Sequence, residues 1–188
     1  MFRYFVKILP VFAVLCCLAV AFISCDDAKP VQSAKNVDIR QKKDSLEKLN
    51  KLLVSKEKAA IKDYIINNNL DMIETGTGLC YCIVNKGNGD SVKTGDLVTM
   101  DYIMTLLNGE IIYSSEENGR KRFVVGHGGV ESGLEEAVLH LHYGDEAEIV
   151  IPSHLAYGLT GDGNKIPINS TIVYKVKVIE NQLNKLNN

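Results

Sequence analysis

Hydrophobic and polar residues alternate over short segments through most of the chain after Asp71, and this period of two is typical of strands with one buried face. The pattern predicts six strands, at Leu79–Val84, Leu97–Leu107, Glu110–Ser114, Lys121–Val125, Glu146–Ile151 and Thr171–Ile179. Asn108-Gly109 lies between two of these segments and is typical of a tight hairpin turn. We therefore expect a sheet domain over residues 71–180, followed by a C-terminal tail at residues 181–188.

One segment inside this domain has the period of a helix instead. Its apolar residues share one face that is about two turns long: Leu134, Ala137, Val138 and Leu141. Ser132 precedes them, with Glu135 three residues on, which is the pattern of a capping box. A single amphipathic helix among strands can bury its apolar face only against the concave face of a bent sheet. The predicted fold class is therefore α+β, a curved antiparallel β-sheet half-barrel wrapped around one short α-helix.

An N-terminal helical arm is predicted at residues 38–70, where Lys, Glu and Leu are frequent and neither Gly nor Pro occurs. Its apolar residues form one narrow stripe: Ile39, Leu46, Leu49, Leu53, Ala60 and Tyr64. The arm is one long helix or two shorter ones that break near Ser55, and the asparagines at 67–69 suit its end. A homodimer through this arm is one interpretation, but Lys42, Lys56 and Asp63 occupy its heptad core positions. Docking against its own domain, or a solvated spacer helix, is therefore favoured.

Residues 1–24 have the pattern of a secretory signal peptide. Arg3 and Lys7 are followed by an uncharged apolar run that is short for a bilayer core, which needs roughly 20 residues. The segment 22–25, Phe-Ile-Ser-Cys, resembles a bacterial lipobox, so we expect lipid on Cys25 and a protein anchored in the cell envelope. An unlipidated signal or an uncleaved anchor is the alternative. The polar residues 25–37, which include Pro30, are predicted as a flexible tether.

Composition excludes several classes of function. The net charge is −2 with both signs interspersed, so no basic surface is expected for nucleic acid. Phosphate-binding loops, serine-hydrolase elbows and zinc-protease motifs are absent from the sequence. Cys80 and Cys82 are separated by one residue on a predicted strand, which favours two small buried side chains over a disulfide. The four histidines are scattered, and we expect no metal site.

An ordered set of short motifs resembles the FKBP-type peptidyl-prolyl isomerases over roughly residues 78–180. The motifs appear in family order: Gly95-Asp96, Asp101-Tyr102, Leu107 to Glu110, Ser114-Ser115, Phe123 to Gly126, Gly133 to Ala137, Tyr143 to Asp145, Ile151-Pro152, Ala156 to Gly158 and Ser170 to Tyr174. With the lipobox and the arm, the chain further resembles the membrane-anchored FKBPs of Gram-negative bacteria, including gliding-motility type lipoproteins of Bacteroidetes.

The resemblance implies rotation about X-Pro peptide bonds, which resonance opposes with a barrier of roughly 18–20 kcal/mol. Such a reaction needs no nucleophile, metal or cofactor. A site accelerates it by binding the twisted amide better than the planar one, inside apolar walls and with few hydrogen-bond donors. The expected ligands are proline-containing segments of exported proteins.

The resemblance also implies the residues of the site. Tyr157 corresponds to the tyrosine whose hydroxyl binds a substrate carbonyl, and the backbone N–H of Glu131 to a second donor. The remaining positions form the walls, floor and closing loop of the pocket: Tyr102, Phe123, Val130 and Tyr174 as walls, Leu134 as the floor and Ile166 on the loop. Tyr102, Phe123, Leu134 and Tyr157 are the predicted catalytic residues.

Four positions depart from the family pattern. Tyr113 occupies the place of an acidic residue, Ile112 that of a wall phenylalanine, and Lys121 that of an aromatic residue. Leu134 forms the floor where the best-known members have tryptophan, although bacterial relatives also use leucine. We place Tyr113 and Ile112 among the substrate-binding positions. The changes at Tyr113 and Ile112 favour a non-catalytic chaperone or a structural lipoprotein, whereas Tyr157, Phe123 and Val130 favour an isomerase. A pocket plugged by Tyr113 or Lys121 would overturn the isomerase hypothesis and leave only an anchored half-barrel.

Overall fold

The computed structural model describes residues 32–179. Its elements are α2 (Gln32–Asn67), β1 (Ile73–Glu74), β2 (Cys80–Asn85), β3 (Leu97–Leu106), β4 (Ile111–Ser114), α3 (Ser115–Asn118), β5 (Lys121–Val124), α4 (Ser132–Val138), β6 (Glu146–Ile151), η2 (Ser153–Leu155) and β7 (Ile172–Ile179). The predicted signal peptide, Cys25 and the tail at 181–188 lie outside the described residues. No helix within residues 32–179 combines the length and the apolar character needed to cross a bilayer.

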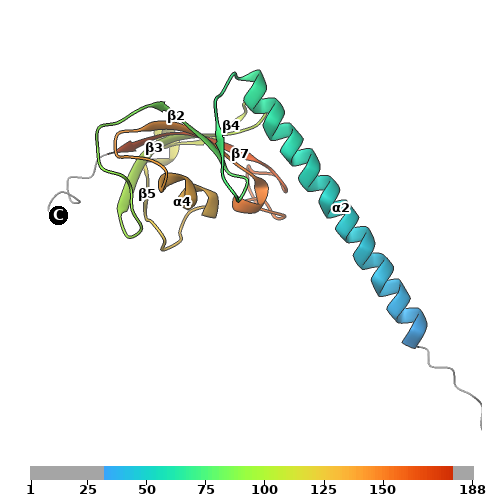
Figure 1. Ribbon diagram of the computed structural model, residues 1–188. Coiled ribbons are helices and arrows are strands. Elements are labelled where there is room, and N and C mark those ends of the chain that lie inside the picture. Colours follow the sequence, from blue (N-terminus) through green and yellow to red (C-terminus); the bar gives the residue numbers. More distant parts are fainter. Residues whose placement is uncertain (1–31, 180–188) are drawn as a thin grey trace, which may run out of the picture. The chain divides into compact units, whose positions relative to one another are not determined.

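The strands form one antiparallel sheet in the order β1-β2-β6-β7-β3-β4, and β5 also pairs with β3 (Figure 1). Strand β3 is central to it. One edge of β3 pairs with β7 along Thr99–Leu106, whereas its other edge pairs first with β5 and then with β4. The six predicted strands are confirmed, with ends that differ by at most one residue. Strand β1, α3 and η2 were not predicted, because two to four residues are too few for a periodic pattern.

Helix α4 packs against one face of this sheet (Figure 1). The four apolar residues predicted for its buried face, including Leu141 just beyond its end, are fully buried. They meet inward-facing side chains of β3, which alternate along the strand: Val98, Met100, Tyr102 and Met104. Gly133 allows the close approach, because a Cβ atom there would collide with side chains of Ile151 and Leu155. The predicted α+β fold, a curved antiparallel sheet around one short helix, is therefore confirmed.

The capping box predicted at Ser132 is wrong. The residue before the helix is Glu131, in an extended conformation and without a side-chain cap, and Ser132 is the first helical residue. The Ser132 hydroxyl instead donates to the carbonyl of Leu155, 3.2 Å away, which ties α4 to η2. Glu135 accepts a hydrogen bond from the N–H of Gly128, 2.9 Å away, in the preceding loop. Tertiary contacts thus use both side chains that the local pattern assigned to the cap.

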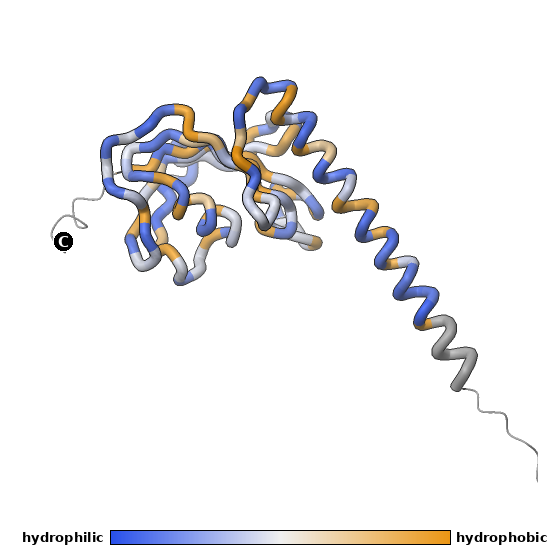
Figure 2. Tube along the Cα trace, in the orientation of Figure 1, coloured by the Kyte–Doolittle hydropathy of each residue, from blue (hydrophilic) through white to orange (hydrophobic). Residues whose placement is uncertain are grey.

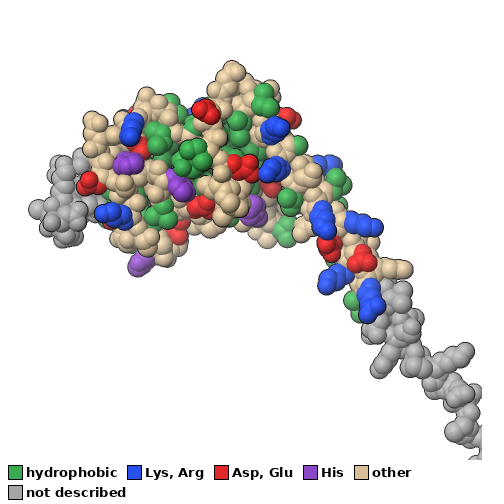
Figure 3. Space-filling model, viewed as in Figure 1, with side chains coloured by type: hydrophobic (Ala, Val, Ile, Leu, Met, Phe, Trp, Pro, Cys, Tyr) green, Lys and Arg blue, Asp and Glu red, His purple; other side chains and the backbone are tan. Residues whose placement is uncertain are grey.

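Helix α2 is a single helix that begins at Gln32, so residues 32–37 of the predicted tether are helical and the break near Ser55 does not occur. It ends at Asn67, and Asn69 adopts the left-handed conformation expected of an asparagine stop, with φ of 53°. Its trace is mostly hydrophilic, and acidic and basic side chains are interspersed along it (Figures 2 and 3). The stripe residues Leu46, Leu49 and Leu53 are exposed.

From Asn50 onward, α2 belongs to the same compact unit as the sheet. Its Ile61 packs in a second buried cluster with Cys80, Val150 and Val173, on which Tyr64 and Ile65 also pack. Polar contacts accompany this cluster, since Glu57 binds Ser153 and Thr171 and Tyr64 binds Glu148. The docking interpretation is therefore confirmed for the last turns of α2. Cys80 and Cys82 are free thiols, and burial raises the pKa of both.

Candidate functional site

The predicted wall and floor residues come together between α4 and the sheet. Six of them are buried members of one hydrophobic cluster: Tyr102, Ile112, Phe123, Leu134, Ile166 and Tyr174. Val130, Tyr157 and Tyr113 are half-buried and pack against that cluster. We call Tyr102, Phe123, Leu134, Tyr157 and Tyr174 the aromatic site. The roles of its residues are still predictions, but the fold brings them into one place.

Strand register explains the position of two tyrosines. Tyr102 and Tyr174 both point inward because each lies at an alternate buried position, on β3 and β7. Tyr102 is paired with Val176, two residues beyond Tyr174, so the two tyrosines are diagonal neighbours. Their ring centroids are 5.8 Å apart and the ring planes are inclined by 57°.

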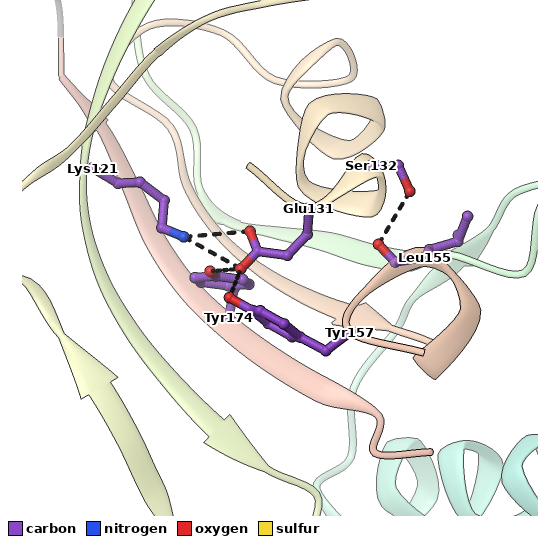
Figure 4. A network of polar contacts seen from close by, with 6 residues as sticks. All are labelled: Lys121, Glu131, Ser132, Leu155, Tyr157 and Tyr174. Atoms are coloured by element: carbon purple, nitrogen blue, oxygen red, sulfur yellow. Dashed lines mark hydrogen bonds and ion pairs between the residues drawn. The ribbon is translucent and has the colours of Figure 1, made fainter. Parts of the chain in front are cut away.

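A buried carboxylate lies beside these rings. Glu131 Oε1 accepts hydrogen bonds from the hydroxyls of Tyr157, at 2.5 Å, and Tyr174, at 3.0 Å (Figure 4). The Lys121 ammonium is 3.4 Å from Oε1 and 3.3 Å from Oε2. The Glu131 side chain is only 4% exposed, and a buried charge is costly unless it has such partners. We call Lys121, Glu131, Tyr157 and Tyr174 the Glu131 network.

Lys121 also contacts the faces of two aromatic rings. Its Nζ atom lies 5.5 Å from the ring centroid of Tyr102 and 5.3 Å from that of Tyr174, within the range of cation–π attraction. The ammonium therefore occupies space over rings that the family resemblance assigns to a proline side chain. Lys121 thus covers two of the five residues of the aromatic site, Tyr102 and Tyr174, which is part of the plugging considered from the sequence.

Tyr113 points elsewhere and does not plug the site. Its hydroxyl donates to Asp162 Oδ2 at 2.5 Å and accepts from the Asn164 amide at 3.1 Å. Asp162 also accepts the N–H groups of Asn164 and Ile166. Burial acts to raise the pKa of Asp162, but the hydrogen bonds from Tyr113 and from these N–H groups lower it overall. Tyr113 therefore holds the loop that carries Ile166.

The Glu131 network keeps its tyrosines protonated. Burial, reinforced by the hydrogen bond to Glu131, raises the pKa of the Tyr157 hydroxyl. Burial and the negative charge of Glu131 also raise the pKa of Tyr174. Each hydroxyl is therefore a donor at neutral pH, and its proton is directed to a carboxylate. A substrate carbonyl that needs the Tyr157 hydroxyl must compete with this acceptor.

Sequence reasoning missed the Glu131 side chain, because only the backbone N–H of this residue was assigned a role. It treated Lys121 as a missing aromatic residue and a possible plug, and it did not foresee the ion pair with Glu131. The available signal was a lysine at a position where an aromatic residue is expected, together with an acidic residue, Glu131, directly beside the predicted wall residue Val130. Among the described residues, no cluster of three or more His, Cys, Asp or Glu side chains could hold a metal ion.

Comparisons with known proteins agree with this geometry. The family model for FKBP-type peptidyl-prolyl cis-trans isomerases matches residues 89–179. FK506-binding protein 1 of Dictyostelium discoideum is 33% identical over 103 residues, which are 54% of this chain and 96% of that protein. FK506-binding protein 4 of Gibberella zeae is 33% identical over 162 residues, which are 86% of this chain and 30% of that protein.

A solved structure is similar beyond the sheet domain. The crystal structure of FkpA from Escherichia coli matches with a TM-score of 0.59 and 26% identity, covering 91% of this chain and 80% of that one. The chain spans between 19% and 39% of the length of the first three curated relatives it matches. Taken with the aromatic site between sheet and helix, these similarities show that the chain belongs to the FKBP-type peptidyl-prolyl cis-trans isomerase family.

Proposed function

We propose that this protein is a peptidyl-prolyl cis-trans isomerase whose site is the aromatic site. The observation that carries this proposal is the meeting of Tyr102, Tyr174 and Phe123, from three strands, with Leu134 of α4 and Tyr157. Aromatic faces around an apolar floor suit a proline ring, and they exclude the water that stabilises the planar amide. The site works by binding the twisted amide better than the planar one.

Two donors are available to the bound segment in this proposal. The backbone N–H of Glu131 lies at the start of α4, and the Tyr157 hydroxyl lies at the rim. Tyr157 must release Glu131 to bind a substrate carbonyl, and Lys121 must leave the rings of Tyr102 and Tyr174. Both steps cost free energy, so we expect modest rates.

A second candidate function has its own support. The Tyr157 hydroxyl is already bound by Glu131 at 2.5 Å, which favours a catalytically weak chaperone or a structural lipoprotein that binds proline-containing segments without rapid turnover. In that case the peptide would bind the aromatic site, while the rate of its isomerisation would stay close to that in water.

The test is an isomerisation assay on an Ala-Xaa-Pro-Phe peptide with the full-length protein. Acceleration at micromolar protein supports the isomerase, and its absence would leave only the binding function. Tyr157→Phe should lower the rate constant about two- to twelvefold, because one hydrogen bond contributes about 0.5–1.5 kcal/mol. Leu134→Ala should lower it as well. Tyr81→Phe is the matched control, because Tyr81 stacks on His140 and lies outside the aromatic site.

The cellular setting is also part of the proposal. The lipobox supports a lipid anchor on Cys25, and with it the membrane-anchored lipoprotein type of Gram-negative bacteria, similar to the gliding-motility lipoproteins of Bacteroidetes. The ligands would be proline-containing segments of exported proteins at the envelope. The exposed leucines of α2, Leu46, Leu49 and Leu53, support a weak homodimer through the arm, which sedimentation of the full chain would detect.

A further inference from the structure

The two partners of the Lys121–Glu131 ion pair are held unequally. Glu131 is 4% exposed and has two tyrosine hydroxyl donors, at 2.5 and 3.0 Å, besides the lysine. Lys121 is 20% exposed, and its distances to the carboxylate oxygens are longer, at 3.3 and 3.4 Å. If Lys121 moves away, the buried Glu131 carboxylate therefore keeps its two tyrosine hydroxyl partners. If the Glu131 carboxylate moved away instead, it would lose all three partners.

The position of Lys121 makes it the side chain that moves. Its ammonium lies over Tyr102 and Tyr174, the rings that would hold a proline. Lysine has a flexible four-carbon stem and a compact charge that is strongly hydrated, so its head can swing toward solvent from the first residue of β5. Leu134 and Tyr174 are fully buried, and they have no comparable freedom.

A ligand that displaces Lys121 removes an ion pair and two cation–π contacts. The displaced ammonium then lies at the rim, where an acidic side chain of the same ligand can pair with it. Glu131 remains bound by the hydroxyls of Tyr157 and Tyr174, whereas the displaced ammonium at the rim is the charge nearer to solvent and to the acidic side chain. A neutral ligand offers no such compensation, and a basic one adds repulsion.

We propose that Lys121 determines specificity by acting as a displaceable gate, and that the site prefers segments in which an acidic residue immediately precedes the proline. This inference rests on the proposed function for the location of the site. It concerns the chemical class of the segment and does not require that the segment be turned over.

The experiment compares Ala-Glu-Pro-Phe with Ala-Gln-Pro-Phe, which differ in charge but hardly in size. Backbone amide shifts of the full-length protein give the dissociation constants, and exchange spectroscopy of the peptides gives the isomerisation rates. We expect wild type to bind the Glu peptide about fivefold more tightly, as one solvent-accessible ion pair allows. Lys121→Met should bind both peptides equally, and it should bind the Gln peptide more tightly than wild type does.

Two further variants serve as controls. Arg122→Met removes a positive charge from the neighbouring, exposed position of β5 and should keep the wild-type preference. Lys121→Arg keeps the charge and should keep the preference too, which separates a charge effect from a packing effect. Amide shifts of residues far from the site report whether each variant folds.

The outcomes separate this inference from the proposed function. Preference for the Glu peptide without acceleration supports the gate and removes the isomerase. Acceleration with equal affinity for both peptides supports the isomerase and overturns the gate. The gate is also overturned if Lys121→Met keeps the preference, or if neither peptide binds to wild type.

Discussion

Glu131 shows how a single residue changes the chemistry of an otherwise apolar site. Its backbone is extended and directly precedes the first residue of α4. Its carboxylate accepts hydrogen bonds from the hydroxyls of Tyr157 and Tyr174. The otherwise apolar site thereby contains a buried charge. The two tyrosines are thus oriented toward the protein itself, and any ligand must compete for their protons.

The raised tyrosine pKa values predict a loss of stability in alkali. A group whose pKa is higher in the folded state stabilises that state fully below its unfolded pKa, here about 10, and this contribution is lost as the pH rises through the folded-state value. The free energy of unfolding should therefore fall above about pH 10. Tyr174→Phe removes one such ionisation, so urea unfolding from pH 8 to 11 should show a shallower decline. Equal slopes for the two proteins would contradict this account.

The short elements are held by contacts that lie far away in sequence. Helix α4 has no side-chain cap and is positioned by Gly133 against β6 and η2, and by the bond from Ser132 to Leu155. At the opposite side of η2, Glu57 of α2 accepts hydrogen bonds from the N–H and hydroxyl of Ser153 and from the Thr171 hydroxyl. The segment that leads to Tyr157 is therefore fixed between two helices.

Gly133→Ala should destabilise the protein by about 1–3 kcal/mol, because overpacking forces β6 and η2 to shift. Thermal or urea unfolding measures this loss. Gly76→Ala is the matched control, since no atom lies within 4 Å of a Cβ placed there and its backbone does not need glycine. If both variants are equally stable, the close approach of α4 does not constrain the fold.

Glu57→Ala should lower the free energy of unfolding by about 1–3 kcal/mol, because it leaves donors of Ser153 and Thr171 without their acceptor. Hydrogen exchange should accelerate at Ser153 and in the last turns of α2. Asp63→Ala removes an exposed acid from the same helix and should change neither quantity. Matching effects of the two substitutions would indicate a general charge effect on α2.

At the scale of the molecule, the sheet is covered on both faces within the unit that begins at Asn50. One cluster contains α4 and the aromatic site, and the other contains Ile61 of α2 with Cys80, Val150 and Val173. Strand β6 is accordingly buried at every position except its first residue, Glu146, although its sequence includes a second glutamate, Glu148. The side chains that the structure describes in the first half of α2 are exposed, which is consistent with the spacer role that accompanies the proposed lipid anchor.

The proposed anchor makes a prediction about the whole chain. On expression in a Gram-negative bacterium, Cys25→Ser should abolish incorporation of labelled fatty acid and release the protein from the membrane fraction, because the proposed lipid is attached to the Cys25 thiol. Cys80→Ser is the control, since that thiol is buried in the domain. Retention of the Cys25→Ser protein in membranes would instead support an uncleaved anchor.

Most of the fold could be predicted from the sequence because its signals are periodic. Alternation at Val98, Met100, Tyr102 and Met104 and helical spacing at Leu134 and Ala137 depend only on which residues must avoid water. The cap at Ser132 could not be predicted in the same way, because its hydroxyl binds Leu155, which is 23 residues away.

For the site, the sequence by itself determined the set of aromatic and apolar residues, since burial pattern and family motifs are both local properties. Only the tertiary structure decided what Glu131 and Lys121 do. Their charges are ten residues apart, on the two sides of a loop, and their pairing depends on how β5 and α4 meet the rings of Tyr102 and Tyr174. Electrostatic partners are set by distance in space, and the order of residues along the chain does not contain that distance.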